Sequence, residues 1–391
     1  MDAALTTGEI FSGIKLVDVD THVSEWPDLW TSRAPASLRD RMPQIVDVNG
    51  KPGWVIDGKP LGMIGTAISA IKNDGSKALG MGFRRWVHAD VHHGAYDAKA
   101  RVAYMDQEGF QAQIAYGNIL GFGGQNAARL DAELRLASTQ IFNDAMAELQ
   151  AESGNRVCPM ALLPWWDVKL AVAEAERCAK MGMRGVNTNS DPHTVGLPPL
   201  GDPHWDPLWE ACSSLGLPVN FHVGASDESM TWFSGGAWPS HSLDTRFGFG
   251  SVMLFISNAR VIANILFSGF LERFPKLNIV SVESGVGWVP FVLEAVAYQM
   301  AECGVKTSLT PLEIFQRQIY ACTWFERRDL VNNVRSLGVD NVMFETDFPH
   351  PTCLYPDPLQ YMRDTAAQFT LEERRKVFGG TAARLYNLPN C

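Results

Sequence analysis

Apolar residues in this 391-residue chain gather in short runs that are rich in Val and Ile and contain few polar residues. Such runs are typical of β-strands buried on both faces, as in a parallel sheet covered by helices. Eight strands are predicted on this basis, at 15–23, 112–118, 157–164, 185–189, 218–224, 277–285, 319–325 and 341–350.

Longer stretches with helical spacing lie between these runs, at 131–152, 167–181, 206–215, 257–274, 289–301 and 327–337. Several begin at Asp or Ser, which commonly cap helix N-termini, and several end near a glycine suited to a C-terminal cap. Eight strands alternating with helices predict an α/β fold, a (β/α)8 TIM barrel that spans residues 1–391 as one domain. An open doubly wound sheet is the alternative, but it usually has fewer strands and a glycine-rich first turn.

Two long connections interrupt this alternation. Nearly ninety residues separate the first two predicted strands, and we expect 31–100 to form an inserted lid over the barrel mouth. A second insertion, 225–250, follows the fifth strand and carries Trp232 and Trp238. We expect these two aromatic residues to line an apolar, shielded cavity and to contact the substrate.

Charge and cysteine content limit the possible partners. With 33 Lys+Arg against 43 Asp+Glu, the net charge of −10 argues against a nucleic-acid or anionic-membrane partner. No uninterrupted apolar run approaches the roughly 20 residues of a membrane helix, and residues 1–10 do not resemble a secretory signal. The seven cysteines lack CxxC spacing, which favours free thiols. We therefore expect a cytoplasmic protein that acts on a small molecule.

Polar residues cluster where the predicted strands end. Asp20 and His22 end the first strand, His222 the fifth, Glu283 the sixth and Asp347 the eighth. In a barrel these ends converge on the active site, and the two-residue period of a strand directs Asp20 and His22 to one face. Histidines and carboxylates together suit a divalent first-row metal, although a buried histidine alone is more typical of a hydrogen-bonded core residue and a lone aspartate of a helix cap.

Further candidates have weaker support. His350, three residues after Asp347, is expected to bind metal or to contact that carboxylate. Three loop histidines are candidates for an additional metal ligand or a substrate contact: His92, His93 and His241. The alternative is that they are solvent-exposed residues without such a role. Two arginines, Arg84 and Arg85, are candidates for holding a substrate carboxylate. The alternative is that they form ordinary ion pairs on the surface.

Six segments carry a family resemblance: VDVDTHVSEWPDLW at 17–30, HGAYDAKARVAYMDQEGFQAQIAYGN at 93–118, NFHVG at 220–224, FSGFLERFPKLNIVSVESGVGWVP at 267–290, ETDFPH at 345–350 and GGTAARLYNL at 379–388. The chain resembles the amidohydrolase superfamily, and within it the branch that holds metal-dependent carboxymuconate-semialdehyde and hydroxybenzoate decarboxylases. The resemblance implies that four residues bind the metal: Asp20, His22, His222 and Asp347.

The segment after the sixth strand departs from the decarboxylase pattern. Decarboxylase relatives place a catalytic histidine there, in a segment reading roughly His-Gly-Gly, whereas this chain has Glu283-Ser284-Gly285. The fourth strand also lacks the lysine that many superfamily hydrolases carbamylate. Glu283 and His350 add two possible ligands, a pattern similar to that of the dinuclear nonheme iron oxygenases of the branch.

The sequence therefore predicts two divalent ions, iron before manganese or zinc, and oxygen-dependent hydroxylation of a small molecule, with Glu283 and Asp347 as catalytic residues. The first alternative is a hydrolase that activates water for attack on a C–N, C–O or C–C bond. The second alternative is a nonoxidative decarboxylase. A noncatalytic scaffold is less expected because the ligand set is complete. Apolar surface at 312–328 and in the first insertion predicts a homo-oligomer, a dimer.

Overall fold

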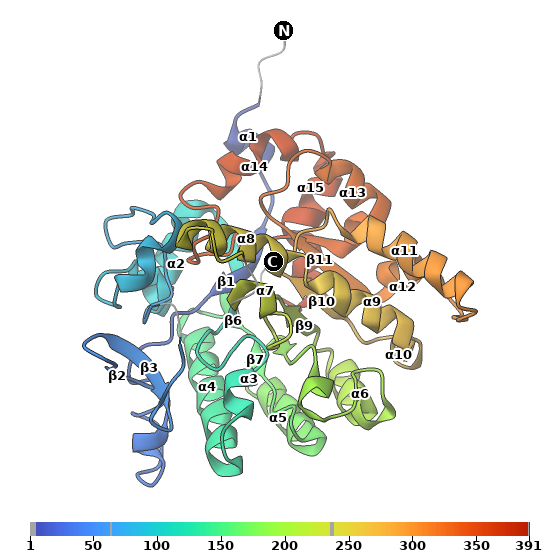
Figure 1. The fold of residues 1–391 in the computed structure, drawn as a ribbon. Coiled ribbons are helices and arrows are strands. Elements are labelled where there is room, and N and C mark those ends of the chain that lie inside the picture. The colour runs from blue at the N-terminus through green and yellow to red at the C-terminus, as the bar shows by residue number, and fades with distance from the viewer. Residues whose placement is uncertain (1–4, 63–64, 235–237, 390) are drawn as a thin grey trace.

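A computed structural model describes residues 5–62, 65–234, 238–389 and 391, and a strand overlaps each of the eight predicted runs (Figure 1). The third run is divided in two at Met160. In chain order the barrel strands are β1 (Leu16–His22), β5 (Phe110–Tyr116), β6 (Val157–Pro159) with β7 (Ala161–Leu162), β8 (Val186–Asn187), β9 (Val219–His222), β10 (Ile279–Val282), β11 (Ile319–Thr323) and β12 (Val342–Phe344).

These strands are parallel and close into a barrel. They form two sheets, in the orders β1-β5-β6 and β12-β11-β10-β9-β8-β7. The barrel closes where the backbone N–H of Asp347 donates to the carbonyl of Asp20 (2.8 Å) and that of His22 to the carbonyl of Phe348 (2.7 Å). The predicted (β/α)8 fold is confirmed, and the open sheet is excluded by this closure.

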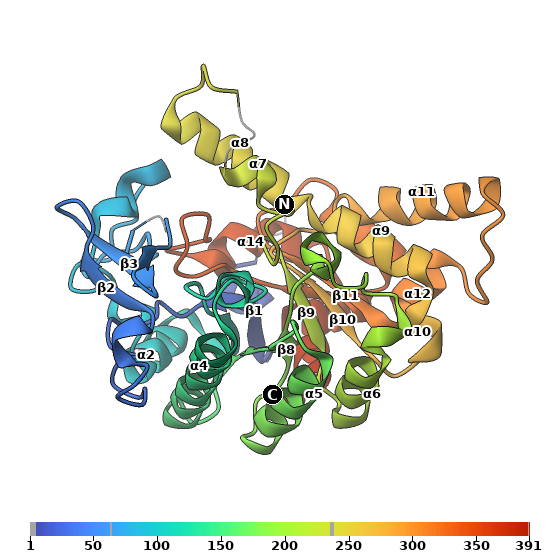
Figure 2. The ribbon, with the colours of Figure 1, turned by 60° about the horizontal axis from the view of Figure 1, so that its bottom comes forward.

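Helices surround the barrel (Figure 2). Five predicted helices lie close to their expected bounds: α4 (Ala132–Glu152), α5 (Val168–Lys180), α6 (Asp206–Leu215), α11 (Val289–Glu302) and α13 (Leu330–Leu337). The predicted helix at 257–274 is divided into α9 (Asn258–Ser268) and α10 (Phe270–Arg273). Gly269 between them adopts a left-handed backbone (φ 67°), which ends an α-helix. Further helices, which the sequence pattern did not predict, are α2 (Ala98–Glu108), α8 (Leu243–Phe255), α12 (Pro311–Gln318) and α14 (Pro358–Ala366).

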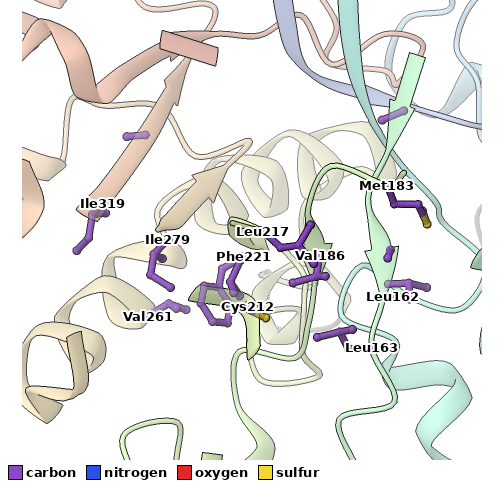
Figure 3. Packing of buried hydrophobic residues seen from close by; sticks show 14 of the residues in the cluster. Leu162, Leu163, Met183, Val186, Cys212, Leu217, Phe221, Val261, Ile279 and Ile319 are labelled. Carbon is purple, nitrogen blue, oxygen red and sulfur yellow. The ribbon is translucent and has the colours of Figure 1, made fainter. Parts of the chain in front are cut away.

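Two large buried clusters make up most of the core, and alternate strand residues contribute to each. Ile279 packs between strands and helices, beside Phe221 and Val261 (Figure 3). Its neighbour Val280 belongs to the cluster inside the barrel. The C-terminal helix α16 (Thr381–Leu385) contributes to this inner cluster, and Tyr386 after it donates a hydrogen bond to Asn220 Oδ1 on β9 (2.7 Å). The end of the chain therefore fills the barrel opposite the site.

The two long connections lie above and beside the barrel (Figure 2). The first contains an antiparallel sheet and the 3-10 helix η2 (Gly80–Arg85), and the second contains α7 (Thr231–Ser234) and α8. The strands of the sheet are β2 (Gln44–Asp47), β3 (Pro52–Ile56) and β4 (Lys59–Pro60). The connections meet where Asp244 Oδ1 accepts a hydrogen bond from the backbone of Met81 (2.9 Å). Residues 63–64 and 235–237 of the predicted insertions lie outside the described residues.

One stretch of the described chain, Leu243–Ser268, is long and apolar enough to cross a membrane by length and composition. Of its most apolar 18-residue window, 44% is buried inside the protein. Core helices of globular domains pass the same test, because a helix covered by protein is also apolar around most of its surface. The absence of a membrane partner stays a prediction.

Candidate metal centre

A change of phase in β1 directs two side chains toward the barrel mouth. Val17 and Val19 point into the inner cluster, as alternate strand residues should. The pairing of β1 with β5 then becomes irregular between Asp18 and Thr21, as at a β-bulge. Asp20 lies within this irregularity and His22 just after it, and both face the site, with His22 Nε2 3.5 Å from Asp20 Oδ1.

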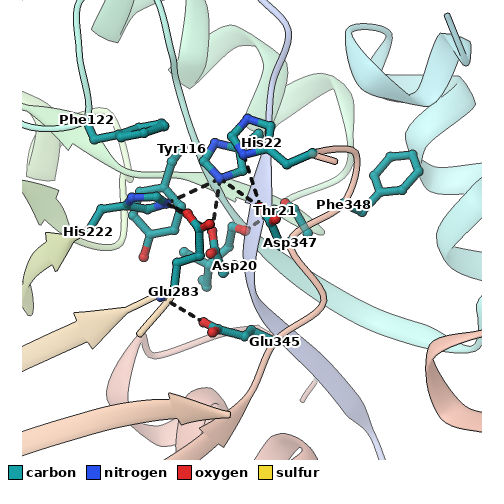
Figure 4. Close-up of polar contacts among 12 residues, drawn as sticks. Asp20, Thr21, His22, Tyr116, Phe122, His222, Glu283, Glu345, Asp347 and Phe348 are labelled. Atoms are coloured by element: carbon teal, nitrogen blue, oxygen red, sulfur yellow. Dashed lines mark hydrogen bonds and ion pairs between the residues drawn. The ribbon is translucent and has the colours of Figure 1, made fainter. Parts of the chain in front are cut away.

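The other predicted donors join this pair from three strand ends (Figure 4). The Nε2 atom of His22 lies 3.3 Å from His222 Nε2 and 3.3 Å from Asp347 Oδ1. Glu283 Oε2 lies 3.3 Å from His222 Nε2. The donors form two overlapping groups, each with its ligand atoms within 4.8 Å of one another: Asp20, His22, His222 and Glu283, and His22, Glu283, Asp347 and His350. All six predicted metal-site residues are therefore brought together.

Two of the carboxylates stand on strained backbone. Glu283 has φ 54° and Asp347 has φ 62°, in the left-handed region that non-glycine residues rarely adopt. Such a conformation costs on the order of 1–3 kcal/mol and is found mainly where function requires it. In each case the turn directs a carboxylate into the site at the point where its strand ends.

Buried polar atoms without partners show that the cluster fits a cation. Both carboxylate oxygens of Asp20 and one of Asp347 are buried and lack a hydrogen-bond partner among the described residues. Buried polar groups are rarely left unsatisfied, and a divalent ion would satisfy carboxylates and imidazoles at once. The buried His/Asp/Glu cluster is therefore a divalent-metal site by its donor chemistry.

The pKa shifts of the donor residues also indicate a site for a cation. Burial raises the pKa of Asp20 and of Glu283, and the nearby Asp347 raises both further. Burial would also raise the pKa of Asp347, but His350 and His22 outweigh it and hold this pKa below its usual range. Burial lowers the pKa of His222 to about 4, so its ring is neutral at pH 7 and able to bind a cation.

A second layer of residues orients the donors, and sequence reasoning missed it. Phe122 stacks on the His222 ring at 4.2 Å between centroids. Glu345 Oε2 accepts the backbone N–H of Glu283 (3.2 Å). Arg101, from α2, donates to the backbone carbonyl of His22 (2.5 Å). Their sequence neighbourhoods gave no sign of these roles, since each contact joins distant parts of the chain.

Asp18 belongs to the same layer, and here a signal was present. Its carboxylate accepts hydrogen bonds from the backbone (2.9 Å) and hydroxyl (2.6 Å) of Thr346, so it links β1 to the end of β12. Burial raises its pKa to about 7. An acidic residue in the middle of an apolar strand is costly to bury, which singles it out from sequence.

A cavity of about 800 Å³ lies over the site. Glu283 and His350 line it and are 5% and 7% exposed, whereas the other four donors are at most 1% exposed and lie deeper. The lining also includes Asn118, Phe122 and Thr352. The six donors thus separate into four deep residues and two that face the cavity.

Several predicted contacts lie elsewhere. Arg84 and Arg85 are exposed on η2, where Phe83 is the buried side chain that reaches the cavity. Trp232 and Trp238 are 44% and 55% exposed and pack against each other on the outer surface. The loop histidines lie outside both donor groups: His93 and His241 are exposed, and half-buried His92 packs on Tyr104 and Phe348. These residues were misplaced because local sequence does not reveal which side of a loop faces a cavity.

Comparison with known proteins places the fold and the site in context. A family model described as amidohydrolase matches residues 17–388. Gamma-resorcylate decarboxylase of Rhizobium radiobacter is 23% identical over 76% of this chain and 90% of its own. An amidohydrolase structure from Mycobacterium avium subsp. paratuberculosis K-10 has a TM-score of 0.79 at 22% identity, covering 96% of this chain and 99% of its own.

A dihydroxybenzoic acid decarboxylase from Polaromonas sp. JS666, solved with manganese and 2-nitroresorcinol, has a TM-score of 0.62 at 19% identity. It covers 97% of this chain and 98% of its own. At these identities the solved structures show a shared fold. The resemblance to the branch that contains decarboxylases is confirmed, whereas the similarity to its iron oxygenases is not supported.

The prediction of oxygen-dependent hydroxylation is wrong. The relatives with named activities that match most of this chain are decarboxylases, at 23–26% identity. The prediction depended on Glu283 and His350 as ligands of a second ion. In the structure the donor groups overlap at His22 and Glu283, and the two extra residues face the cavity. Two ions and a preference for iron stay predictions.

Proposed function

Because the chain belongs to the amidohydrolase family, we propose that it is a metal-dependent nonoxidative decarboxylase of aromatic acids. The observation that carries the proposal is the division of the donor set. Four deep residues surround the centre, while Glu283, whose pKa is raised by burial, faces the cavity where an acid would bind. The decarboxylase relatives support the same reaction class.

Four deep residues, drawn from both donor groups, would hold one divalent ion: Asp20, His22, His222 and Asp347. Glu283, which belongs to both groups, would then be left as the proton donor beside it. When bound, the ion supplies positive charge that binds the substrate carboxylate and stabilises negative charge developing next to it. Manganese is the ion named for one solved decarboxylase of this fold. A second ion, as predicted from the sequence, would need Glu283 and His350 as ligands, and metal counting separates the two arrangements.

Glu283 would supply the proton that replaces carbon dioxide. A protonated carboxyl group at the cavity floor can donate its proton to the ring carbon that bears the substrate carboxylate. As the proton arrives, the bond from that carbon to the carboxylate breaks, carbon dioxide leaves, and the electron pair of the broken bond forms the new C–H bond. Glu283 is left ionised and regains a proton from water in the cavity. Glu283 would thus take the role of the catalytic histidine that decarboxylase relatives have after the sixth strand.

The two insertions would act together as a lid. Phe83 from the first and Phe247 from the second line the cavity and lie 6.3 Å apart between ring centroids. A roof of this kind excludes water from the developing negative charge. The predicted homodimer also stays a proposal, supported by the exposure of Phe291 (74%) and Tyr298 (61%) on α11.

The proposal is tested by carbon dioxide release from a panel of hydroxybenzoic acids, including 2,6-dihydroxybenzoate, with manganese-loaded protein. In heavy water the product should carry one deuterium at the carbon that lost the carboxylate. We expect Glu283→Gln to lower kcat by about 10²-fold or more with metal content unchanged, and Glu283→His to recover part of the loss. Failure of every acid to release carbon dioxide would refute the reaction, and loss of metal in Glu283→Gln would make this residue a ligand.

A further inference from the structure

The cavity over the metal centre is much larger than one aromatic ring requires. An apolar protein cavity of about 150 Å³ is large enough to hold benzene. The volume here is about 800 Å³, toward the upper end of the roughly 300–1,000 Å³ typical of sites for drug-sized ligands. A single-ring acid bound at the metal would leave most of this space to water.

The cavity is polar at its floor and apolar above. Around the centre its lining includes Asn118, Glu283, His350 and Thr352, which is where a carboxylate would be held. The rest of the lining also contains Gln125, Asn126 and Ser251, but most of its large side chains are apolar, among them Met81, Phe83, Met230, Phe247, Leu254 and Phe255. Water gains few hydrogen bonds against such walls, so they favour an apolar ligand.

Charged residues of the lining leave the middle of the cavity neutral. Arg129 and Asp227 form an ion pair with each other and are 60% and 55% exposed. Arg246 lies on α8 and is also exposed. Because these charged side chains are exposed to solvent, a substrate body bound deeper in the cavity would meet uncharged and mainly apolar side chains.

From this size and polarity we infer that the substrate is a carboxylic acid with an apolar body larger than one aromatic ring, such as a fused bicyclic or aryl-extended acid. The inference rests on the proposed function for the place of the carboxylate. The apolar body occupies the space under α8, with Leu254 and Phe247 against it. Burying a second ring in this space removes further apolar surface from water, which strengthens binding roughly in proportion to the area buried.

The test measures binding, so that it does not depend on turnover. Isothermal titration of manganese-loaded protein with benzoate and 2-naphthoate should give a Kd at least tenfold lower for 2-naphthoate. Equal or weaker binding of 2-naphthoate would overturn the inference. Two-ring binding without decarboxylation would leave the inference standing and refute the proposed reaction. Turnover of single-ring acids without binding of 2-naphthoate would support the proposed reaction and overturn the inference about substrate size.

Matched variants on α8 locate the second ring. Leu254 lines the cavity, whereas Val252 on the same helix is 56% exposed and lies outside the lining. Leu254→Trp should weaken 2-naphthoate binding at least tenfold and leave benzoate within about twofold, whereas Val252→Trp should change neither. An equal loss for both acids would contradict the assigned position. If the helical circular dichroism of Leu254→Trp is lost, the smaller enlargement Leu254→Phe takes its place.

Discussion

Asn118 holds His350 in one orientation. Its amide nitrogen donates to the carbonyl of Val23 (2.8 Å) and to Glu25 Oε2 (3.2 Å), so Oδ1 is the atom that faces His350 Nε2, at 2.9 Å. His350 must therefore donate from Nε2, which leaves Nδ1 directed at Asp347 Oδ1, 3.1 Å away. A histidine beside a metal centre is commonly fixed in this way by the partner of its outer nitrogen.

Removal of this acceptor should impair the site without emptying it. We expect Asn118→Ala to lower kcat by about 10–100-fold while manganese content stays near that of the unaltered protein. The matched control is Asn126→Ala, because Asn126 also lines the cavity but donates to the carbonyl of Ile119 instead. Steady-state rates and elemental analysis of both variants measure the effect, and equal losses in the two would contradict an orienting role.

Asp20→Asn should abolish most metal binding and should make the metal-free protein more stable. Burial and the carboxylate of Asp347 destabilise an ionised Asp20 in the metal-free protein. The amide cannot replace the carboxylate as a ligand, so most of the metal should be lost. The metal-free variant should nevertheless be more stable than metal-free unaltered protein, by about 1–3 kcal/mol at pH 8 in urea unfolding. Exposed Asp28 provides the control Asp28→Asn, which should change neither property.

This stability difference should also depend on pH. The folded protein raises the pKa of Asp20 above its ordinary value of 3.8, so between these values the folded state holds a proton that the unfolded state releases. Unfolding of metal-free unaltered protein is therefore favoured as pH rises above about 4, and Asp20→Asn lacks this contribution. The advantage of the variant should grow from pH 5 to pH 8. A constant difference would show that Asp20 stays ionised throughout.

Arg101 should be essential for the fold around β1. Its buried guanidinium donates to the His22 carbonyl and to Thr21 Oγ1 (3.2 Å) and lies over the Phe348 ring. Removing one member of a buried polar network leaves the others unpaired, so Arg101→Met should lower the free energy of unfolding by about 3–5 kcal/mol. Exposed Lys99 on the same helix gives the control Lys99→Met. Chemical denaturation of the metal-free proteins separates this loss from changes in metal affinity.

The buried carboxylate of Glu174, paired with Arg177 on the same helix α5 and bonded to Asn143 on α4, gives a prediction far from the site. Burial alone would raise the pKa of Glu174, but hydrogen bonds from Arg177 (2.7 Å) and Asn143 (2.6 Å) outweigh it and lower this pKa. The resulting stability is present above the ordinary value of 4.5 and is lost as pH falls below it.

Glu174→Gln should therefore cost about 1.5–3 kcal/mol at pH 7, and less at pH 4. Glu176, exposed on the same helix, is the control. Urea unfolding at both pH values measures the difference, which should be absent for Glu176→Gln. A cost that increases on acidification would mean that burial, and not the hydrogen bonds, controls the titration of Glu174.

The barrel and the donor set could be predicted because both depend on short-range regularities. Strands buried on both faces leave apolar runs, and their carboxyl ends meet in one place whatever lies between them. Asp20 and His22 were therefore predictable from a two-residue period. The left-handed backbone of Glu283 and the orientation of His350 were not, because each depends on contacts with residues far along the chain.

The reaction was mispredicted for the same reason. A carboxylate and an imidazole near a metal site were counted as extra ligands, since sequence gives residue types without the direction of their side chains. Arg84 and Phe83 illustrate the problem on a smaller scale. They are adjacent in sequence, yet the phenylalanine lines the cavity and the arginine lies on the outer surface. Only the three-dimensional structure separates such neighbours.

The closure of the barrel determines when the centre can be assembled during synthesis. Asp20 lies on the first barrel strand, but the backbone N–H of Asp347 that pairs with its carbonyl comes after the last. Tyr386, which fills the opposite end, is later still. A nascent chain therefore carries Asp20, His22 and His222 for more than a hundred residues of synthesis without the partner that completes the set. Metal capture by the full set must follow the emergence of the final barrel strand from the ribosome, so loading is late relative to the synthesis of the first three ligands.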